Sequence, residues 1–171
     1  EINAAGGLLG QPVEYVVEDN ATDPKLTIEK ANKLMKQDQV DVIIGMITSA
    51  ERNAAISVTG PAKQLVIYPT YYEGGHCDPS LVNTGQVPNQ SVDPFVPWLI
   101  ENVGKSFYVV GSDYVWPRET AKAVKAVVEA NGGTYVGEEY FPFGTSDYAS
   151  VINRIKSANA DITWMMIAGV D

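Results

Sequence analysis

The sequence has little of what metal centres, disulfides and nucleic-acid surfaces require. Its 171 residues include one histidine and one cysteine, which excludes a histidine-cluster metal site and a disulfide within this chain. The sequence has 12 Lys and Arg residues and 21 Asp and Glu residues, which gives a net charge of −9. This charge argues against nucleic acids or anionic membranes as partners. The longest apolar runs, such as residues 40–46, are far too short for insertion into a membrane.

The motifs of common enzyme classes are missing as well. The sequence contains no P-loop, no G-x-S-x-G nucleophile elbow and no G-x-G-x-x-G after its first apolar run. A serine triad would need His76, which neighbours Cys77 in a Gly- and Pro-rich stretch that we expect to be a surface loop. We therefore expect a protein that is not an enzyme and has no cofactor or metal. The alternative is an α/β enzyme whose catalytic residues lie outside this chain.

What the sequence does contain is a regular alternation of two patterns. Residues 12–19 alternate apolar and polar side chains, which predicts a strand with one apolar face. Short β-branched or aromatic runs predict further strands, covered on both faces, at residues 40–45, 64–68, 106–111, 134–139 and 161–168. The stretches between these runs are amphipathic at helical spacing. Strands that alternate with helices are typical of βαβ units, so we predict an α/β fold with parallel sheets.

Four helices are predicted within these amphipathic stretches, and three of them have a start or stop signal. Asp23 and Pro24 form an N-cap and a first helical position, and residues 92–103 carry the clearest apolar face. A helix over residues 121–128 is expected to end at Gly132, where positive φ is tolerated. The last helix has apolar residues between 151 and 158, and we expect Thr145 or Ser146 to cap it.

The alternation lapses between residues 68 and 88, in a loop rich in Tyr, Gly and Pro. We place the passage from a first to a second lobe after this loop, with the first lobe at residues 1–103 and the beginning of the second at 104–171. The chain starts without Met and stops directly after a strand. We therefore expect a two-lobed protein that is truncated at both ends, with the first strand and most of the first helix missing.

Ligands of parallel α/β sheets bind at the carboxyl ends of the strands. Residues 19–20 and 169–171 are expected at such strand ends. Hydroxyl groups and aromatic rings are concentrated at the strand ends as well, and this mixture suits a small polar ligand. The candidate ligand-binding residues are Thr48, Ser49, Ala50, Tyr68, Thr70, Tyr114 and Trp116.

Each candidate also has a purely structural interpretation. Ser49 is expected to cap a helix whether or not it binds a ligand, and Thr70 suits an ordinary turn. Tyr114 and Trp116 suit packing in the core or between lobes. Glu73 and Asp113 are most simply loop caps or solvated charges.

These strand-end segments resemble those of type I periplasmic binding proteins. The segments at 45–52, 68–74, 88–90 and 111–118 read GMITSAER, YPTYYEG, PNQ and GSDYVWPR. Within that Rossmann-like fold they are most similar to the branch of urea- and short-chain-amide-binding proteins and the amide-sensing regulator of amidase operons. The resemblance runs the length of the chain but covers about half of a family member.

The resemblance implies a periplasmic protein whose two lobes close on a small solute and deliver it to an ABC-type membrane permease. The solute would be an amide, urea or an aliphatic amino acid. Ser49 and Thr70 would hydrogen-bond its polar head, Tyr68 would line the cleft, and Tyr114 and Trp116 would close from the second lobe. The alternative is a cytoplasmic ligand-sensing regulator of the amide-sensor type.

Overall fold

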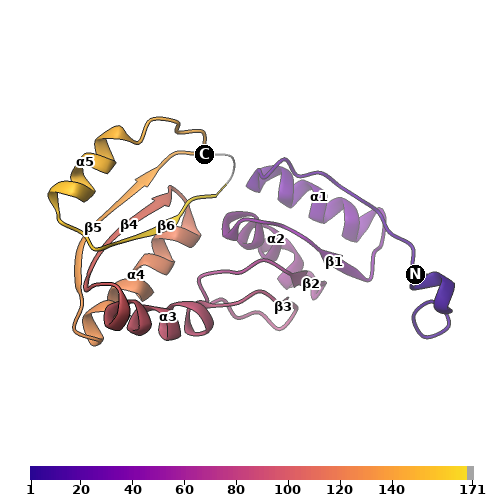
Figure 1. Cartoon of the computed structure of the whole chain (residues 1–171). Coiled ribbons are helices and arrows are strands. Elements are labelled where there is room, and N and C mark those ends of the chain that lie inside the picture. The colour runs from indigo at the N-terminus through magenta and orange to yellow at the C-terminus, as the bar shows by residue number, and fades with distance from the viewer. Residues whose placement is uncertain (169–171) are drawn as a thin grey trace.

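A computed structural model describes residues 1–168, and the expected rim segment 169–171 lies outside the described residues. A short 3-10 turn, Asn3–Ala5, precedes alternating helices and strands (Figure 1). The helices are α1 Pro24–Lys36, α2 Ser49–Ala62, α3 Pro88–Asn102, α4 Val115–Ala130 and α5 Ala149–Ser157. The strands are β1 Val42–Ile44, β2 Leu65–Tyr68, β3 Leu81–Asn83, β4 Ser106–Ser112, β5 Thr134–Phe141 and β6 Ile162–Met166.

The strands form two separate parallel sheets, with the orders β1-β2-β3 and β5-β4-β6. Figure 1 shows the first sheet with α1 and α2 in one half of the molecule and the second sheet with α3, α4 and α5 in the other. All strand pairs are parallel, as the alternation of strands and helices predicts. The predicted α/β class is therefore confirmed.

The first sheet packs on α1 and α2. Asp23 accepts hydrogen bonds from the backbone N–H groups of Lys25 and Leu26, both at 2.8 Å, and Pro24 stands at the first helical position, which confirms the predicted start of α1. The core of this half consists of Ala31, Ile43, Ile56 and Val66. The opposite face of the sheet is open, since Val42 and Ile44 are exposed, so the expectation of cover on both faces is wrong for β1.

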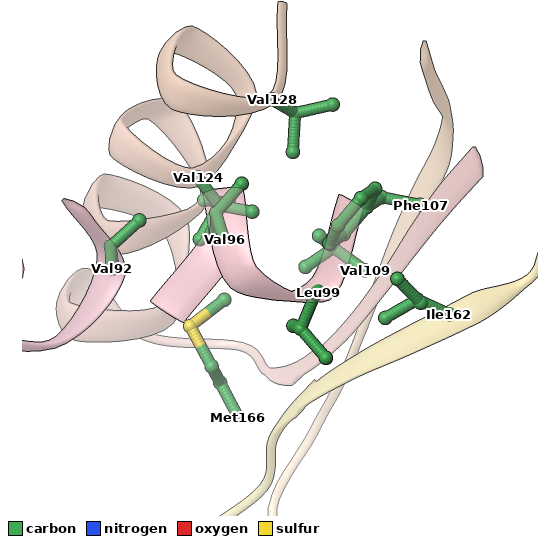
Figure 2. Close-up of a cluster of buried hydrophobic side chains, with 10 residues drawn as sticks. Val92, Val96, Leu99, Phe107, Val109, Val124, Val128, Ile162 and Met166 are labelled. Carbon is green, nitrogen blue, oxygen red and sulfur yellow. The ribbon is translucent and has the colours of Figure 1, made fainter. Parts of the chain in front are cut away.

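The second sheet is covered on both faces. Figure 2 shows the larger cluster, in which α3 and α4 lie against β4 and β6; its labelled members are Val92, Val96, Leu99, Phe107, Val109, Val124, Val128, Ile162 and Met166. On the other face, Tyr108 and Val110 pack with Val151 of α5. The apolar face predicted for α3 is thus buried at three positions, whereas Phe95 and Val103 at its edges are exposed.

Two local predictions are wrong. Residues 12–19 form no strand, and their alternating apolar side chains Tyr15 and Val17 are 86% and 80% exposed. Alternation marks one face of a strand but supplies no hydrogen-bonding neighbour, and this segment joins no ladder among residues 1–168. Neither Thr145 nor Ser146 caps α5; Asp147 accepts from the backbone N–H of Ala149 at 2.9 Å instead.

Within the described part of the chain, no helix has the length and apolar character to cross a membrane. The same residues hold no group of three or more His, Cys, Asp or Glu side chains arranged to bind a metal ion.

Candidate functional site

The loop after β1 leads into a capping box that fixes the start of α2. The Thr48 hydroxyl accepts from the backbone N–H of Glu51 at 3.2 Å, and the Glu51 carboxylate accepts from the Thr48 backbone N–H at 2.6 Å. Asn20 adds a third anchor by donating to the other Glu51 oxygen at 2.6 Å. The cap is therefore Thr48 rather than Ser49, and the Ser49 side chain stands in the first turn, followed by the half-buried Ala50.

Ser49 donates its hydroxyl proton to Glu73 at 2.5 Å. The other Glu73 oxygen accepts from Arg52 at 2.6 Å. The side chain of Arg52 is 1% exposed and that of Glu73 is 9% exposed, so Glu73 belongs to a buried ion pair. The expectation of a loop cap or a solvated charge at Glu73 is therefore wrong. The Arg52 guanidinium also lies over the rings of Tyr68 and Tyr72, at 5.3 and 4.8 Å from their centroids.

The two other candidate hydroxyls of the first half form hydrogen bonds with the loop after β1. Tyr68 donates to the carbonyl of Ile47 at 2.7 Å, and Thr70 donates to the carbonyl of Met46 at 3.1 Å. Burial raises the pKa of Tyr68, and the neighbouring Arg52 guanidinium and the Ser49 and Thr70 hydroxyls oppose that rise. Ser49, Tyr68 and Thr70 are therefore together, as the carboxyl ends of β1 and β2 predict.

From the second half, Tyr114 and Trp116 approach this cluster through aromatic contacts. Trp116 meets Tyr71 edge-on with ring centroids 4.9 Å apart, and Tyr114 lies 6.2 Å from Trp116 and 5.3 Å from Phe143. Burial raises the pKa of Tyr114, and Tyr71, Tyr68 and the carboxylates of the first half add to the rise.

Other candidate charges of the rim are already paired. Asp113 forms an ion pair with Arg118 at 2.8 Å, and that guanidinium lowers the pKa of Asp113. Asp19 accepts from the backbone N–H of Ala21 at 2.7 Å. Cys77 is a free, exposed thiol, in keeping with the surface loop predicted around it.

A hollow of about 490 Å³ lies beside the aromatic contacts, between α3 and β6. Tyr71 and Trp116 line it together with Phe95 and Trp164. Ser49, Tyr68 and Thr70 do not line it, and Ser49 and Tyr68 are only 1% and 0% exposed. In this conformation a solute reaches the two buried hydroxyls only after the surrounding chain has moved.

The sequence alone does not indicate Arg52 as a part of this site, although Tyr71 and Tyr72 belong to the aromatic residues expected at the strand ends. The segment SAER carries the arginine three residues after Ser49, and YPTYYEG carries its carboxylate partner. A sequence alone does not distinguish a buried arginine from a solvated one, since most arginines are exposed.

The whole chain, residues 1–171, matches a family model described as the periplasmic binding protein domain. The chain is 26% identical over 168 residues to a Leu/Ile/Val-binding protein, BraC3, of Rhizobium johnstonii, covering 96% of this chain and 46% of that protein. It is 25% identical over 175 residues to an amino acid binding protein of Pseudomonas aeruginosa, covering 96% and 45%. The chain thus spans about half the length of the curated relatives it matches.

Solved structures agree in fold. A periplasmic binding protein from Burkholderia mallei superimposes with a TM-score of 0.86 at 24% identity, covering 98% of this chain and 46% of that one. A solute binding protein of an ABC transporter from R. palustris, in complex with benzoate, gives a TM-score of 0.85 at 21% identity, covering 98% and 48%. At these identities the likeness establishes the fold.

Proposed function

Because the chain belongs to the periplasmic binding protein domain family, we propose that its parent is the solute-binding protein of an ABC-type transporter. It captures a small polar solute between two lobes in the periplasm and presents it to a membrane permease. The named relatives are binding proteins for amino acids, and one similar structure holds benzoate.

One observation carries the proposal. Hydroxyls of Ser49, Tyr68 and Thr70 gather at the carboxyl rim of the first sheet, and the rings of Tyr114 and Trp116 approach from the second sheet. A solute that touches both groups is bound only when the two halves are close. Binding therefore shifts the population toward closure, and a permease that contacts both halves reads the bound state.

The start of α2 supports this assignment. Thr48 holds the first turn through its capping box, so that Ser49 and Ala50 stand at a fixed place on the rim. Tyr71 extends the aromatic side toward Trp116. Hydroxyls for polar atoms and rings for apolar faces suit an amide, urea or an aliphatic amino acid.

The test is isothermal titration of the full-length parent protein with short amides, urea, aliphatic amino acids and benzoate. We expect at least one solute to bind, and we expect the double variant Ser49→Ala, Thr70→Ala to bind it roughly tenfold or more weakly, because two hydrogen-bonding groups are lost. Ser57→Ala is the matched control, since Ser57 lies on an exposed face of the same helix, α2. Absence of heat with every solute, or a double variant that binds as before, contradicts the proposal.

A further inference from the structure

We propose that Phe143, in the loop after β5, is a positioning residue of the solute site. Its ring lies against the ring of Tyr114 and holds that ring in the orientation in which it meets a solute. This inference rests on the proposed function, in which Tyr114 approaches the solute from the second sheet, and it adds a residue that acts only through Tyr114.

Tyr114 lacks the hydrogen bonds that would fix its side chain. It stands at the N-cap of α4, where Ser, Thr, Asp or Asn would accept from the first turn, and its side chain makes no such bond. Its hydroxyl also forms no hydrogen bond with any residue among 1–168. Two side-chain torsions must nevertheless be fixed for the ring to have one orientation. Contacts with other rings are therefore what positions it.

Two rings make these contacts, and they differ in what else they touch. Trp116 lies 6.2 Å from Tyr114 and also meets Tyr71 of the first half at 4.9 Å, so its surroundings change when the halves separate. Phe143 lies 5.3 Å from Tyr114, with 32° between the ring planes, and belongs to the same half. The contact between Phe143 and Tyr114 is therefore kept whether the halves are open or closed.

A tight turn fixes Phe143 itself. The Pro142 carbonyl accepts from the backbone N–H of Thr145 at 3.3 Å and from the Thr145 hydroxyl at 2.7 Å. Gly144 has a φ of +82°, a conformation that glycine adopts without strain and that suits the third position of such a turn. Phe143 at the second position is thereby held at a defined place.

The same segment also holds the backbone beside Tyr114. The Phe141 carbonyl, two residues before Phe143, accepts from the backbone N–H of Asp113 at 2.7 Å. The Phe143 side chain is 52% exposed, so burial in a core does not account for its position. Its contact with Tyr114 does, because paired rings attract each other beyond the area that they bury.

The experiment is isothermal titration of the full-length parent protein with acetamide, urea, leucine and benzoate, and the probe that binds most tightly is carried to the variants. We expect Phe143→Ala to bind it roughly threefold to tenfold more weakly, because the Tyr114 ring must then be ordered on binding. Phe143→Tyr keeps a ring at this place and should bind as the unaltered protein does. Trp98→Ala is the matched control, since Trp98 is also 52% exposed but stacks on Phe95.

A double-mutant cycle separates positioning from direct contact with the solute. In a Tyr114→Ala background, Phe143→Ala should weaken binding no further, because the ring that it positions is gone. An equal loss in both backgrounds, or an unchanged affinity of Phe143→Ala alone, overturns the inference and leaves the proposed function standing.

Nuclear magnetic resonance of the parent protein with isotope-labelled tyrosine tests the ring contact without any solute. Tyr114→Phe identifies the Tyr114 signals, and we expect Phe143→Ala to shift them while Trp98→Ala does not. Tyr114 signals that stay in place in Phe143→Ala overturn the inference even where a solute binds. If the signals shift but no probe binds the unaltered protein, the proposed function fails and the positioning role fails with it.

Discussion

Arg52 illustrates how much of the candidate site depends on a single side chain. Its guanidinium has one carboxylate partner, Glu73, and one amide partner, Asn53. Its Nε and Nη1 atoms have no hydrogen-bond partner among the described residues, although the rings of Tyr68 and Tyr72 lie beside the charge. An arginine this buried is tolerated only while its partner is in place.

We expect Arg52→Met to lower the free energy of unfolding of the chain by about 3–5 kcal/mol, because it leaves Glu73 largely buried without its cation. Urea denaturation at neutral pH measures the change. Arg118→Met is the matched control and is expected to have little effect, since Arg118 and Asp113 are 49% and 43% exposed.

The double variant Arg52→Met, Glu73→Gln separates loss of the pair from loss of packing. It leaves no charge without a partner, so we expect it to be more stable than Arg52→Met alone. Equal stability of the single and double variants would mean that the charge of Glu73 is tolerated without its arginine, and the buried pair would then not explain the site.

At this scale the sequence predicted residue types but not their pairing. Ser49, Tyr68 and Thr70 are the hydroxyls expected at the rim, and they do lie together. The partner of Ser49, however, lies 24 residues away in a loop, and the sequence around Glu73 contains nothing that distinguishes a buried carboxylate from a solvated one. Such a pairing follows from how β1 and β2 are placed side by side.

At the scale of the elements, α2 has one threonine at its N-cap whose hydroxyl is hydrogen-bonded and one within the helix whose hydroxyl is not. Thr48 forms the capping box with Glu51, whereas Thr59 is 0% exposed and its hydroxyl has no partner among the described residues. Removal of the two hydroxyls should therefore have opposite effects on stability.

We expect Thr48→Val to destabilise the chain by about 1–2 kcal/mol, since the cap and its bond to Glu51 are lost. Thr59→Val keeps the shape and removes a buried hydroxyl without a partner, so we expect it to be neutral or stabilising by up to about 1 kcal/mol. Thermal unfolding of the two variants side by side measures both. A Thr59→Val variant as destabilised as Thr48→Val would contradict this account of the helix.

Helices were the more predictable elements because their signals are local. The Asp23 cap, the stop at Gly132 and the apolar face of α3 each act within a few residues. A strand depends on a neighbour that the sequence does not specify. Residues 12–19 have the right alternation and still form no strand, whereas β3, with only three residues, pairs with β2 because Val66 and Leu81 lie in register.

At the scale of the whole molecule, two cores are assembled from different elements. The first contains residues of α1, α2, β1 and β2, and the larger second core contains residues of α3, α4, β4 and β6. The sequence predicts α3 at the end of the first lobe, because a new series of strands begins after this helix. Its buried residues Val92, Val96 and Leu99 pack with Phe107 and Val109 of the second sheet.

We therefore expect α3 to unfold with the second sheet, and native-state hydrogen exchange of two valine variants tests this. Val66 and Val96 are both 0% exposed, one in each core, and truncation of either to alanine should cost about 2 kcal/mol. Val66→Ala should lower the protection of amides in α2, β1 and β2 and leave α3 unchanged, because α3 shares no core residue with them. Val96→Ala should lower protection in α3, α4 and β4 together. If Val66→Ala instead lowers the protection of the α3 amides, the helix unfolds with the first sheet. A lobe boundary after residue 103 then describes the molecule better than one before α3.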